Sequence, residues 1–217
     1  MAGSEPSNLY SVTSTPLSVP SDTSKFISSN KPNSSTKKVG YFTVNDPENT
    51  RGLSNTRFDY SFGVAKEGKP HEISVSNQKR FNSMKNVEAL ALDTVSKDKR
   101  MYLTFDCGYE YKNLTGKILD TLKKKKVKAA FFVTLDYVKS NPKFVCRMIN
   151  EGHIVGNHSA THPVFPNLSR TEMAKEIYSV DKYLKDNFDY TSPYFRFPAG
   201  AYSKNSLELV TSIGYKS

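Results

Sequence analysis

The sequence is poor in the features that define several large classes of protein. It contains two cysteines, Cys107 and Cys146, and we expect two unpaired thiols rather than the disulfide framework of a small secreted domain. No run approaches the roughly 18 apolar residues of a membrane span, and the first 30 residues lack the apolar core of a signal peptide. We therefore expect no membrane span. The protein either stays inside the cell or acts outside it with an export signal that this chain does not include.

Acidic residues are in the minority. The chain has 31 Lys and Arg against 21 Asp and Glu, which gives a formal net charge of +10. A basic protein suits nucleic acid, anionic lipid or an anionic wall polymer as partner. No helix-turn-helix, zinc-finger or RNA-binding pattern is present, so we expect no nucleic-acid partner. The lysine run 123–126 with Lys128 is typical of a solvated helix end, and polyanion binding there is the less favoured alternative.

Composition divides the chain into three parts. Residues 1–38 are rich in Ser, Thr, Asn and Pro, which predicts a disordered tail because this segment cannot bury enough surface to offset its chain entropy. Residues 39–98 are an extension that packs on the main domain. Within it we expect a short strand at 39–44, an arm at 46–63 that packs Phe58, Tyr60 and Phe62 on the domain, a surface histidine at 71, and a short helix at 82–91.

The third part, residues 99–217, alternates strand and helix patterns. The expected strands are 101–105, 127–134, 153–156, 194–197 and 215–217, and the expected helices are 113–125, 142–151, 170–187 and 203–214. Ser169 and Glu172 have the spacing of a capping box at the start of the third helix. This alternation predicts an α/β fold in which right-handed crossovers give a parallel sheet or barrel.

Two of the four histidines, His158 and His162, lie four residues apart just after a predicted strand. Imidazoles at this spacing in one turn are able to bind the same metal ion. The pattern is short, and two polar loop histidines are the alternative.

Asp106 and Cys107 end the first strand of the domain. A carboxylate at the mouth of the sheet is placed to take a proton from water that a metal ion activates. A capping or turn aspartate is the alternative for a lone Asp near Gly. The thiolate of Cys107 would complete a Cys/His/His zinc site, or its thiol is a small buried side chain.

The segment FRFPAGAYS (195–203) is the third candidate part of the site. Arg196 leaves a strand end and is suited to pair with Asp106, which would fix the orientation of that carboxylate. Pro198 and Gly200 shape a loop whose backbone N–H groups are able to face an oxyanion. A surface arginine and an ordinary turn are the alternative.

These three segments together closely resemble the motifs of the polysaccharide deacetylase family, whose domain is the NodB-homology domain of carbohydrate esterase family 4. TFDCGYE (104–110) is similar to the first motif, HSATH (158–162) to the second and RFPAGAY (196–202) to the third. Within the family, the GYE ending and RGLSN (51–55) look most like the muramic δ-lactam branch of peptidoglycan deacetylases.

The resemblance implies a partial, distorted (β/α) barrel and the metal-dependent removal of acetyl groups from a cell-wall glycan, outside the cytoplasm. Asp106 would be the general base, Arg196 would orient it, and the Ala199 backbone N–H would help to bind the oxyanion. His158, His162 and Cys107 would hold a divalent ion, for which we expect zinc. The resemblance also places four residues at the substrate: Tyr109, Pro198, Gly200 and Tyr202.

The chain departs from the family pattern in two respects. Cys107 stands where most members have a second Asp as metal ligand. The family's fourth and fifth motifs, the latter with a histidine general acid, would lie downstream, so we expect an incomplete domain whose last strand, 215–217, has an open apolar edge. A catalytically weak glycan-binding module and a chitin-oligosaccharide deacetylase are the alternatives.

Overall fold

The architecture was obtained as a computed structural model, which describes residues 35–61, 64–95 and 101–217. These residues belong to one contact unit, 33–217. The strands are β1 (Thr36–Val39), β2 (Phe42–Asn45), β3 (Phe58–Asp59), β4 (Thr104–Cys107), β5 (Ala130–Val133), β6 (Ile154–Asn157) and β7 (Ala201–Tyr202). The helices are α1 (Glu72–Asn82), α2 (Leu114–Lys125), α3 (Leu135–Ser140), α4 (Pro142–Asn150), α5 (Arg170–Phe188) and α6 (Lys204–Ser212), with short 3-10 turns η1 (Phe165–Asn167) and η2 (Pro198–Gly200).

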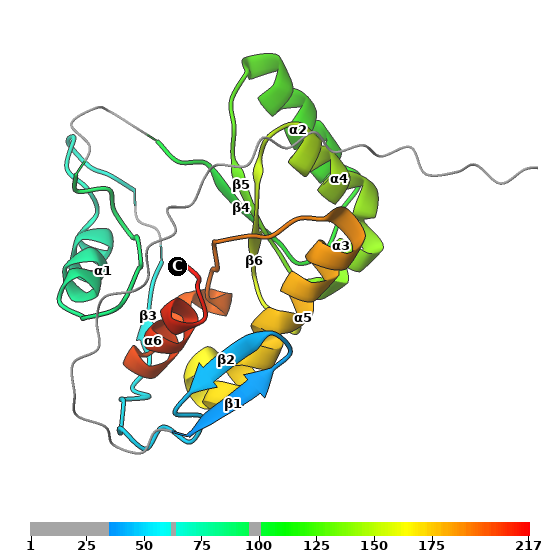
Figure 1. The fold of residues 1–217 in the computed structure, drawn as a ribbon. Helices are drawn as coiled ribbons and strands as arrows, with labels where there is room; N and C mark the ends of the chain where they lie inside the picture. Colours follow the sequence, from blue (N-terminus) through cyan, green and yellow to red (C-terminus); the bar gives the residue numbers. More distant parts are fainter. Residues whose placement is uncertain (1–34, 62–63, 96–100) are drawn as a thin grey trace, which may run out of the picture. The chain divides into compact units, whose positions relative to one another are not determined.

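A parallel sheet in the order β4-β5-β6 positions the site (Figure 1). Its register places Asp106 beside Phe132, and Phe132 beside Gly156. Two single parallel bridges extend the order, from Asn157 to Phe195 and from Tyr194 to Lys216. The α/β fold with a parallel sheet is thus confirmed, although the fourth and fifth expected strands are reduced to bridges.

Helix periodicity explains how the sheet is covered. In α2, Leu119 and Leu122 are buried, and α2 contacts α4, which in turn contacts β6. The predicted capping box at the start of α5 is present, because the Ser169 hydroxyl accepts from the Glu172 N–H and the Glu172 carboxylate accepts from the Ser169 N–H. The helix α5 is the central support, since it contacts α3, α6, β1, β2 and β6.

The expected single strand at 39–44 is wrong, because the chain reverses within it. Gly40 and Tyr41 form the turn of an antiparallel hairpin in which Val39 pairs with Phe42. Gly40 has a φ of 58°, which favours glycine. The hairpin lies against α5 (Figure 1) and buries three apolar side chains: Val39, Phe42 and Val44.

The expected helix at 82–91 is also wrong. The helix α1 ends at Asn82 and begins after His71, whose half-buried ring caps it by accepting from the Ile73 N–H. The helix buries polar Asn77 and Gln78, which hides its periodicity. The side-chain oxygen of Gln78 accepts from the N–H groups of Ala91 and Leu92. The segment after α1 therefore folds back on the helix instead of continuing it.

Several other expectations change at the edges of the elements. The predicted tail ends too late, since Thr36–Lys38 belong to β1; residues 1–34 and Phe62 lie outside the described part. The expected open edge at 215–217 is wrong, because Ser217 donates to the Glu88 carbonyl at 2.9 Å and accepts from the Leu90 N–H at 2.7 Å. The six-residue helix α3 was not predicted.

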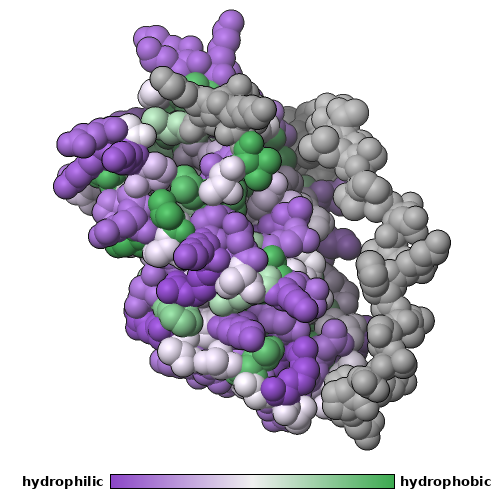
Figure 2. Space-filling model, turned by 90° about the vertical axis from the view of Figure 1, so that its left-hand side faces the viewer, coloured by the Kyte–Doolittle hydropathy of each residue, from purple (hydrophilic) through white to green (hydrophobic). Residues whose placement is uncertain are grey.

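The surface agrees with the basic, polar composition. Figure 2 shows one face on which hydrophilic residues prevail and hydrophobic ones form small separate spots. Within the described ranges 35–61, 64–95 and 101–217, no helix has the length and apolarity needed to cross a membrane.

Candidate active site

The carboxyl ends of the parallel strands bring the three sequence motifs together. Asp106 lies near the end of β4, and His158 directly follows β6. The third segment joins them through backbone bonds with Asn157, whose N–H donates to the Tyr194 carbonyl and whose carbonyl accepts from the Arg196 N–H at 2.9 Å. The topology, rather than any local sequence signal, therefore assembles the site.

Arg196 and Asp106 form the expected ion pair. An Arg196 guanidinium nitrogen lies 2.8 Å from Asp106 Oδ1, and the guanidinium carbon lies 4.2 Å from the centre of the Phe132 ring. Gly156 permits this packing, since a Cβ there would lie 2.4 Å from the same ring. Both charged side chains are partly exposed, so the pair contributes little to stability and mainly fixes the direction of the carboxylate.

His158 and His162 meet edge to face, with ring centres 4.9 Å apart. His158 is 3% exposed, and its Nδ1 lies 2.9 Å from the Arg196 carbonyl oxygen. A carbonyl oxygen only accepts, so Nδ1 carries the proton and Nε2 keeps a free lone pair. Burial lowers the pKa of His158 despite the nearby carboxylate of Asp106, and the ring is therefore held neutral, as a metal ligand must be.

The turn that carries the histidines is held by the polar residues Asn157 and Ser159, which the sequence places beside the two rings. Asn157 is fully buried; its side-chain oxygen accepts from the Ser159 N–H, and its amide donates to the Ile177 carbonyl. Ser159 and His162 have positive φ values of 70° and 60°, and the Ser159 hydroxyl accepts from the His162 N–H.

Cys107 does not join the histidine pair. Successive residues of a strand point to opposite faces, so Cys107 turns away from the face of Asp106 and packs in an apolar cluster with Val133. Burial raises the pKa of its thiol to about 12, and the charges of Asp106 and Glu110 act in the same direction. Among the residues that the structure describes, no three His, Cys, Asp or Glu side chains are grouped to hold a metal ion.

The loop after Arg196 has an unusual backbone conformation. Ala199 has φ 53° and ψ 16°, a left-handed conformation for a non-glycine residue. Gly200 also has a positive φ, and a Cβ there would lie 1.9 Å from the Tyr60 carbonyl oxygen. Pro198 is buried beside them.

The two tyrosines expected at the substrate differ in their surroundings. Tyr109 is 80% exposed and free to contact a ligand from the rim. Tyr202 is 1% exposed, and its hydroxyl is bonded to Asn77 and Arg80. Direct contact between Tyr202 and substrate is therefore not supported, because helix α1 already covers the ring.

Glu110, the last residue of the first motif, has a structural role. Its carboxylate accepts from the Thr115 N–H at 3.1 Å and from the Tyr137 hydroxyl at 3.3 Å. Burial acts to raise the pKa of Glu110, but these hydrogen bonds outweigh it and lower the pKa. Asn113, the N-cap of α2, makes no side-chain cap bond, so Glu110 satisfies the helix end in its place.

Comparison with known proteins identifies the class. A sequence model described as polysaccharide deacetylase matches residues 93–217, and the chain belongs to this family. The chain is 40% identical over 123 residues to the Bacillus subtilis peptidoglycan-N-acetylmuramic acid deacetylase PdaA, which is 56% of this chain and 46% of that protein. It spans about half the length of the curated relatives it matches.

Solved structures give the same result. The structure of B. subtilis PdaA, a family 4 carbohydrate esterase, superimposes with a TM-score of 0.64 and 30% identity, covering 76% of this chain and 68% of that one. A family 4 carbohydrate esterase from Bacillus anthracis gives a TM-score of 0.61 and 35% identity, covering 76% and 73%.

Proposed function

We propose that this chain catalyses metal-dependent de-N-acetylation of a cell-wall glycan. The observation that carries the proposal is the joint arrangement of Asp106, Arg196 and His158. One segment supplies both the guanidinium that orients Asp106 and the carbonyl that orients His158. The membership in the deacetylase family supports the same chemistry.

The histidine pair is suited to a divalent ion, and we expect zinc. His158 has its Nδ1 engaged by a carbonyl and its Nε2 lone pair free, which is the usual preparation of a histidine ligand. His162 faces it from the exposed side of the same turn. A bound ion of this kind polarises a carbonyl and lowers the pKa of water. Cys107, in the core, is not included in this ligand set.

The chain's own residues have separate roles in the proposed reaction. Water adds to the acetyl carbonyl carbon while Asp106 accepts its proton. The proton then passes from Asp106 to the amide nitrogen as the C–N bond breaks, which gives acetic acid, ionised to acetate in solution, and a free amine. Arg196 holds the Asp106 carboxylate in a fixed direction through their ion pair. The Ala199 N–H donates to the oxygen that becomes negative in the transition state.

The proposed substrate is N-acetylmuramic acid within peptidoglycan. Similarity over 123 residues to the B. subtilis peptidoglycan-N-acetylmuramic acid deacetylase supports this choice. The proposed place of action is the cell wall, outside the cytoplasm, where that substrate is found. Exposed Tyr109 at the rim is the side chain we assign to substrate contact.

The test measures acetate released from glycan strands of peptidoglycan and from chitopentaose, with zinc content determined on the same samples. We expect the wild-type chain to bind zinc and to release acetate, and His158→Ala to lose both. His71→Ala is the matched control for zinc content, because His71 belongs to none of the three motifs and its ring accepts from the Ile73 N–H at the start of helix α1. Zinc content that is unchanged in His158→Ala would overturn the ligand assignment, and a wild type without acetate release would overturn the proposed activity.

A second candidate is glycan binding without turnover. One observation favours it: no group of three metal ligands is present in the described part of the chain. The same samples decide between the two, since this alternative predicts retention on peptidoglycan with no acetate released by the wild type.

A further inference from the structure

The arm before helix α1 pairs with the loop that carries Ala199. Phe58 and Asp59 form β3, which lies antiparallel to Ala201 and Tyr202 of β7. The Tyr60 N–H donates to the Gly200 carbonyl at 2.8 Å. A Cβ on Gly200 would lie 1.9 Å from the Tyr60 carbonyl oxygen, so only glycine allows the two backbones to approach this closely.

Helix α1 braces both strands of this pair through Arg80. The guanidinium carbon lies 4.1 Å from the centre of the Phe58 ring, and the guanidinium donates to the Tyr202 hydroxyl at 2.8 Å. One side chain therefore contacts both β3 and β7. The Tyr202 hydroxyl donates in turn to Asn77 of α1, and burial raises the pKa of Tyr202 so that this hydroxyl keeps its proton.

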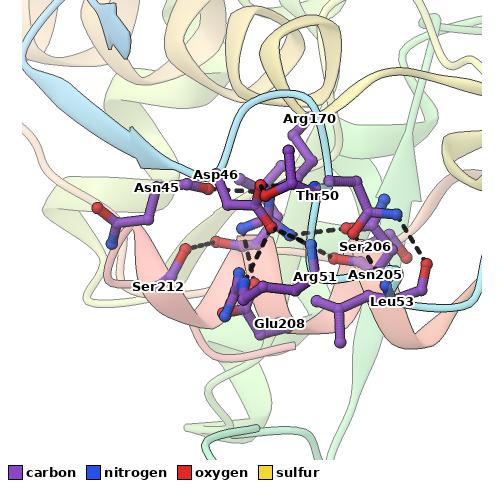
Figure 3. A network of polar contacts seen from close by, with 12 residues as sticks. Asn45, Asp46, Thr50, Arg51, Leu53, Arg170, Asn205, Ser206, Glu208 and Ser212 are labelled. Atoms are coloured by element: carbon purple, nitrogen blue, oxygen red, sulfur yellow. Dashed lines mark hydrogen bonds and ion pairs between the residues drawn. The ribbon is translucent and has the colours of Figure 1, made fainter. Parts of the chain in front are cut away.

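The beginning of the arm is held by a partly buried polar network (Figure 3). Asp46 accepts from Arg51, and Arg51 pairs with Glu208 of α6 at 3.1 Å. Arg170 of α5, which is buried, pairs with the same Glu208 at 2.6 Å. The arm is thus fixed to α5 and α6 at one end and to β7 at the other.

The Asn205 N–H adds a further bond between the arm and helix α6, which follows β7, since it donates to the Ser54 carbonyl at 3.1 Å. These contacts surround a backbone conformation that needs support. Ala199 has a positive φ, and such residues persist only where neighbouring structure determines them.

We propose that Arg80 is a positioning residue for the proposed deacetylation, and that it acts by clamping β3 onto β7 so that the Ala199 N–H keeps its direction. The inference rests on the proposed function of that N–H. Arg80 and β3 precede residue 93, where the family match begins, whereas β7 lies within the match.

The kinetic test compares Arg80→Ala with Arg57→Ala. Arg57 belongs to the same arm, but it makes only an exposed ion pair with Asp59 among the described residues. We expect Arg80→Ala to lower kcat by about 10- to 100-fold, because small displacements of a transition-state donor are costly. KM should stay within about 2-fold, since ground-state binding does not use that donor. Arg57→Ala should match wild type in both constants.

Two further variants separate positioning from loss of structure. Arg80→Lys keeps the charge but lacks the planar fork that both stacks and donates, so kcat should recover only in part. Gly200→Ala separates β3 from β7 by a clash in the loop itself, instead of by loss of Arg80. It should reproduce the kcat loss of Arg80→Ala. The thermal midpoint of Arg80→Ala should fall by less than about 5 °C.

Amide hydrogen exchange tests the clamp without requiring activity. We expect Arg80→Ala to speed exchange in peptides covering 198–205, while peptides covering β5 and α4 stay as in wild type. Exchange that rises everywhere, or nowhere, would overturn the clamp, as would equal losses of kcat in Arg80→Ala and Arg57→Ala. If the wild type releases no acetate, the proposed function fails, and the exchange result alone decides whether Arg80 holds this loop.

Discussion

At the residue scale, Asp106 is the side chain on which the proposed chemistry depends most directly. Asp106→Asn keeps the size of the side chain but removes its ability to take a proton. We expect acetate release to fall by about 10²- to 10⁴-fold. The thermal midpoint should change little, because the ion pair with Arg196 is partly exposed. Asp59→Asn, which alters another exposed carboxylate paired with an arginine, is the control. Activity within a few-fold of wild type would show that Asp106 is structural.

Asp46 should matter for stability instead of catalysis. It is 1% exposed, and its carboxylate accepts from Thr50 and Arg51 at once. Burial opposes the charged form, but these hydrogen bonds outweigh it and hold the pKa of Asp46 well below its usual range.

We expect Asp46→Asn to lower the free energy of unfolding by about 2–4 kcal/mol, because the amide cannot satisfy the buried donors. Urea unfolding at pH 7 measures the loss, with Asp59→Asn expected to lose less than about 1 kcal/mol. Equal losses in the two variants would contradict the role of the buried network.

The sequence predicted which motif side chains form an ion pair. It failed for residues whose role depends on the direction in which the side chain points. The Asp106–Arg196 pair was expected and is present. Cys107 was expected at the metal, but strand alternation directs it into the core. Tyr202 was expected at the substrate, but it is covered by α1, a helix that the sequence did not place. Neither fact is visible in a motif.

At the scale of single elements, the β1–β2 hairpin depends on the space above Gly40. A Cβ there would lie 2.0 Å from the Tyr178 ring of α5, and the residue also has a positive φ. Gly52 has a similar φ of 65° but nothing within 4 Å of the same position. The two glycines therefore separate backbone strain from a steric clash.

We expect Gly52→Ala to destabilise the protein by about 1 kcal/mol through backbone strain alone. Gly40→Ala should cost about 1–3 kcal/mol more, because the hairpin must move away from α5. Thermal unfolding of both variants is the measurement. A Gly40→Ala variant as stable as Gly52→Ala would mean that the hairpin does not rest on Tyr178.

The helices that the sequence predicted well have a clear apolar face and a clear start. Helix α5 shows both, through its capping box at Ser169. Helix α1 shows neither, since it buries Asn77 and Gln78 and is capped by a histidine. The hairpin was missed because a two-residue turn inside VGYFTV looks like one strand. The fourth strand was overestimated, because Phe195 pairs at a single position.

At the scale of the whole molecule, His153 should make stability depend on pH. Its ring is buried at the opposite end of the sheet from the motifs, and its Nδ1 accepts from the Ala129 N–H. Burial lowers the pKa of His153; Lys128 and Arg147 act in the same direction, and Glu151 opposes them. As pH falls below about 6.5, His153 therefore takes up a proton in the unfolded chain more readily than in the folded chain.

We expect the thermal midpoint to fall as pH decreases from 7.5 to 5, since stability in this window is lost when the unfolded state takes up the proton. His153→Asn keeps an acceptor for the Ala129 N–H but does not titrate, so its midpoint should vary less with pH. The comparison is one of slopes at constant ionic strength, because the substitution also removes the contact with Phe131. Parallel slopes would show that His153 does not control the dependence.

The position of the β1–β2 hairpin also has a consequence for the order in which the protein forms during synthesis. The ribosome makes residues 36–45 well before their partners, which are Tyr178 and Asp181 of α5 and the more distant Tyr215. At normal elongation rates, synthesis of these partners follows synthesis of the hairpin by on the order of 10 s, and the apolar side of the hairpin is uncovered during this time. Closing such long loops is slow, so the hairpin should dock after the rate-limiting step.

Stopped-flow refolding of Tyr41→Phe, which lacks the bond to Asp181, tests this order: unfolding should accelerate while refolding keeps its rate, and a slower refolding rate would place docking earlier. Until it docks, the apolar face of the hairpin remains exposed to chaperones and to other nascent chains.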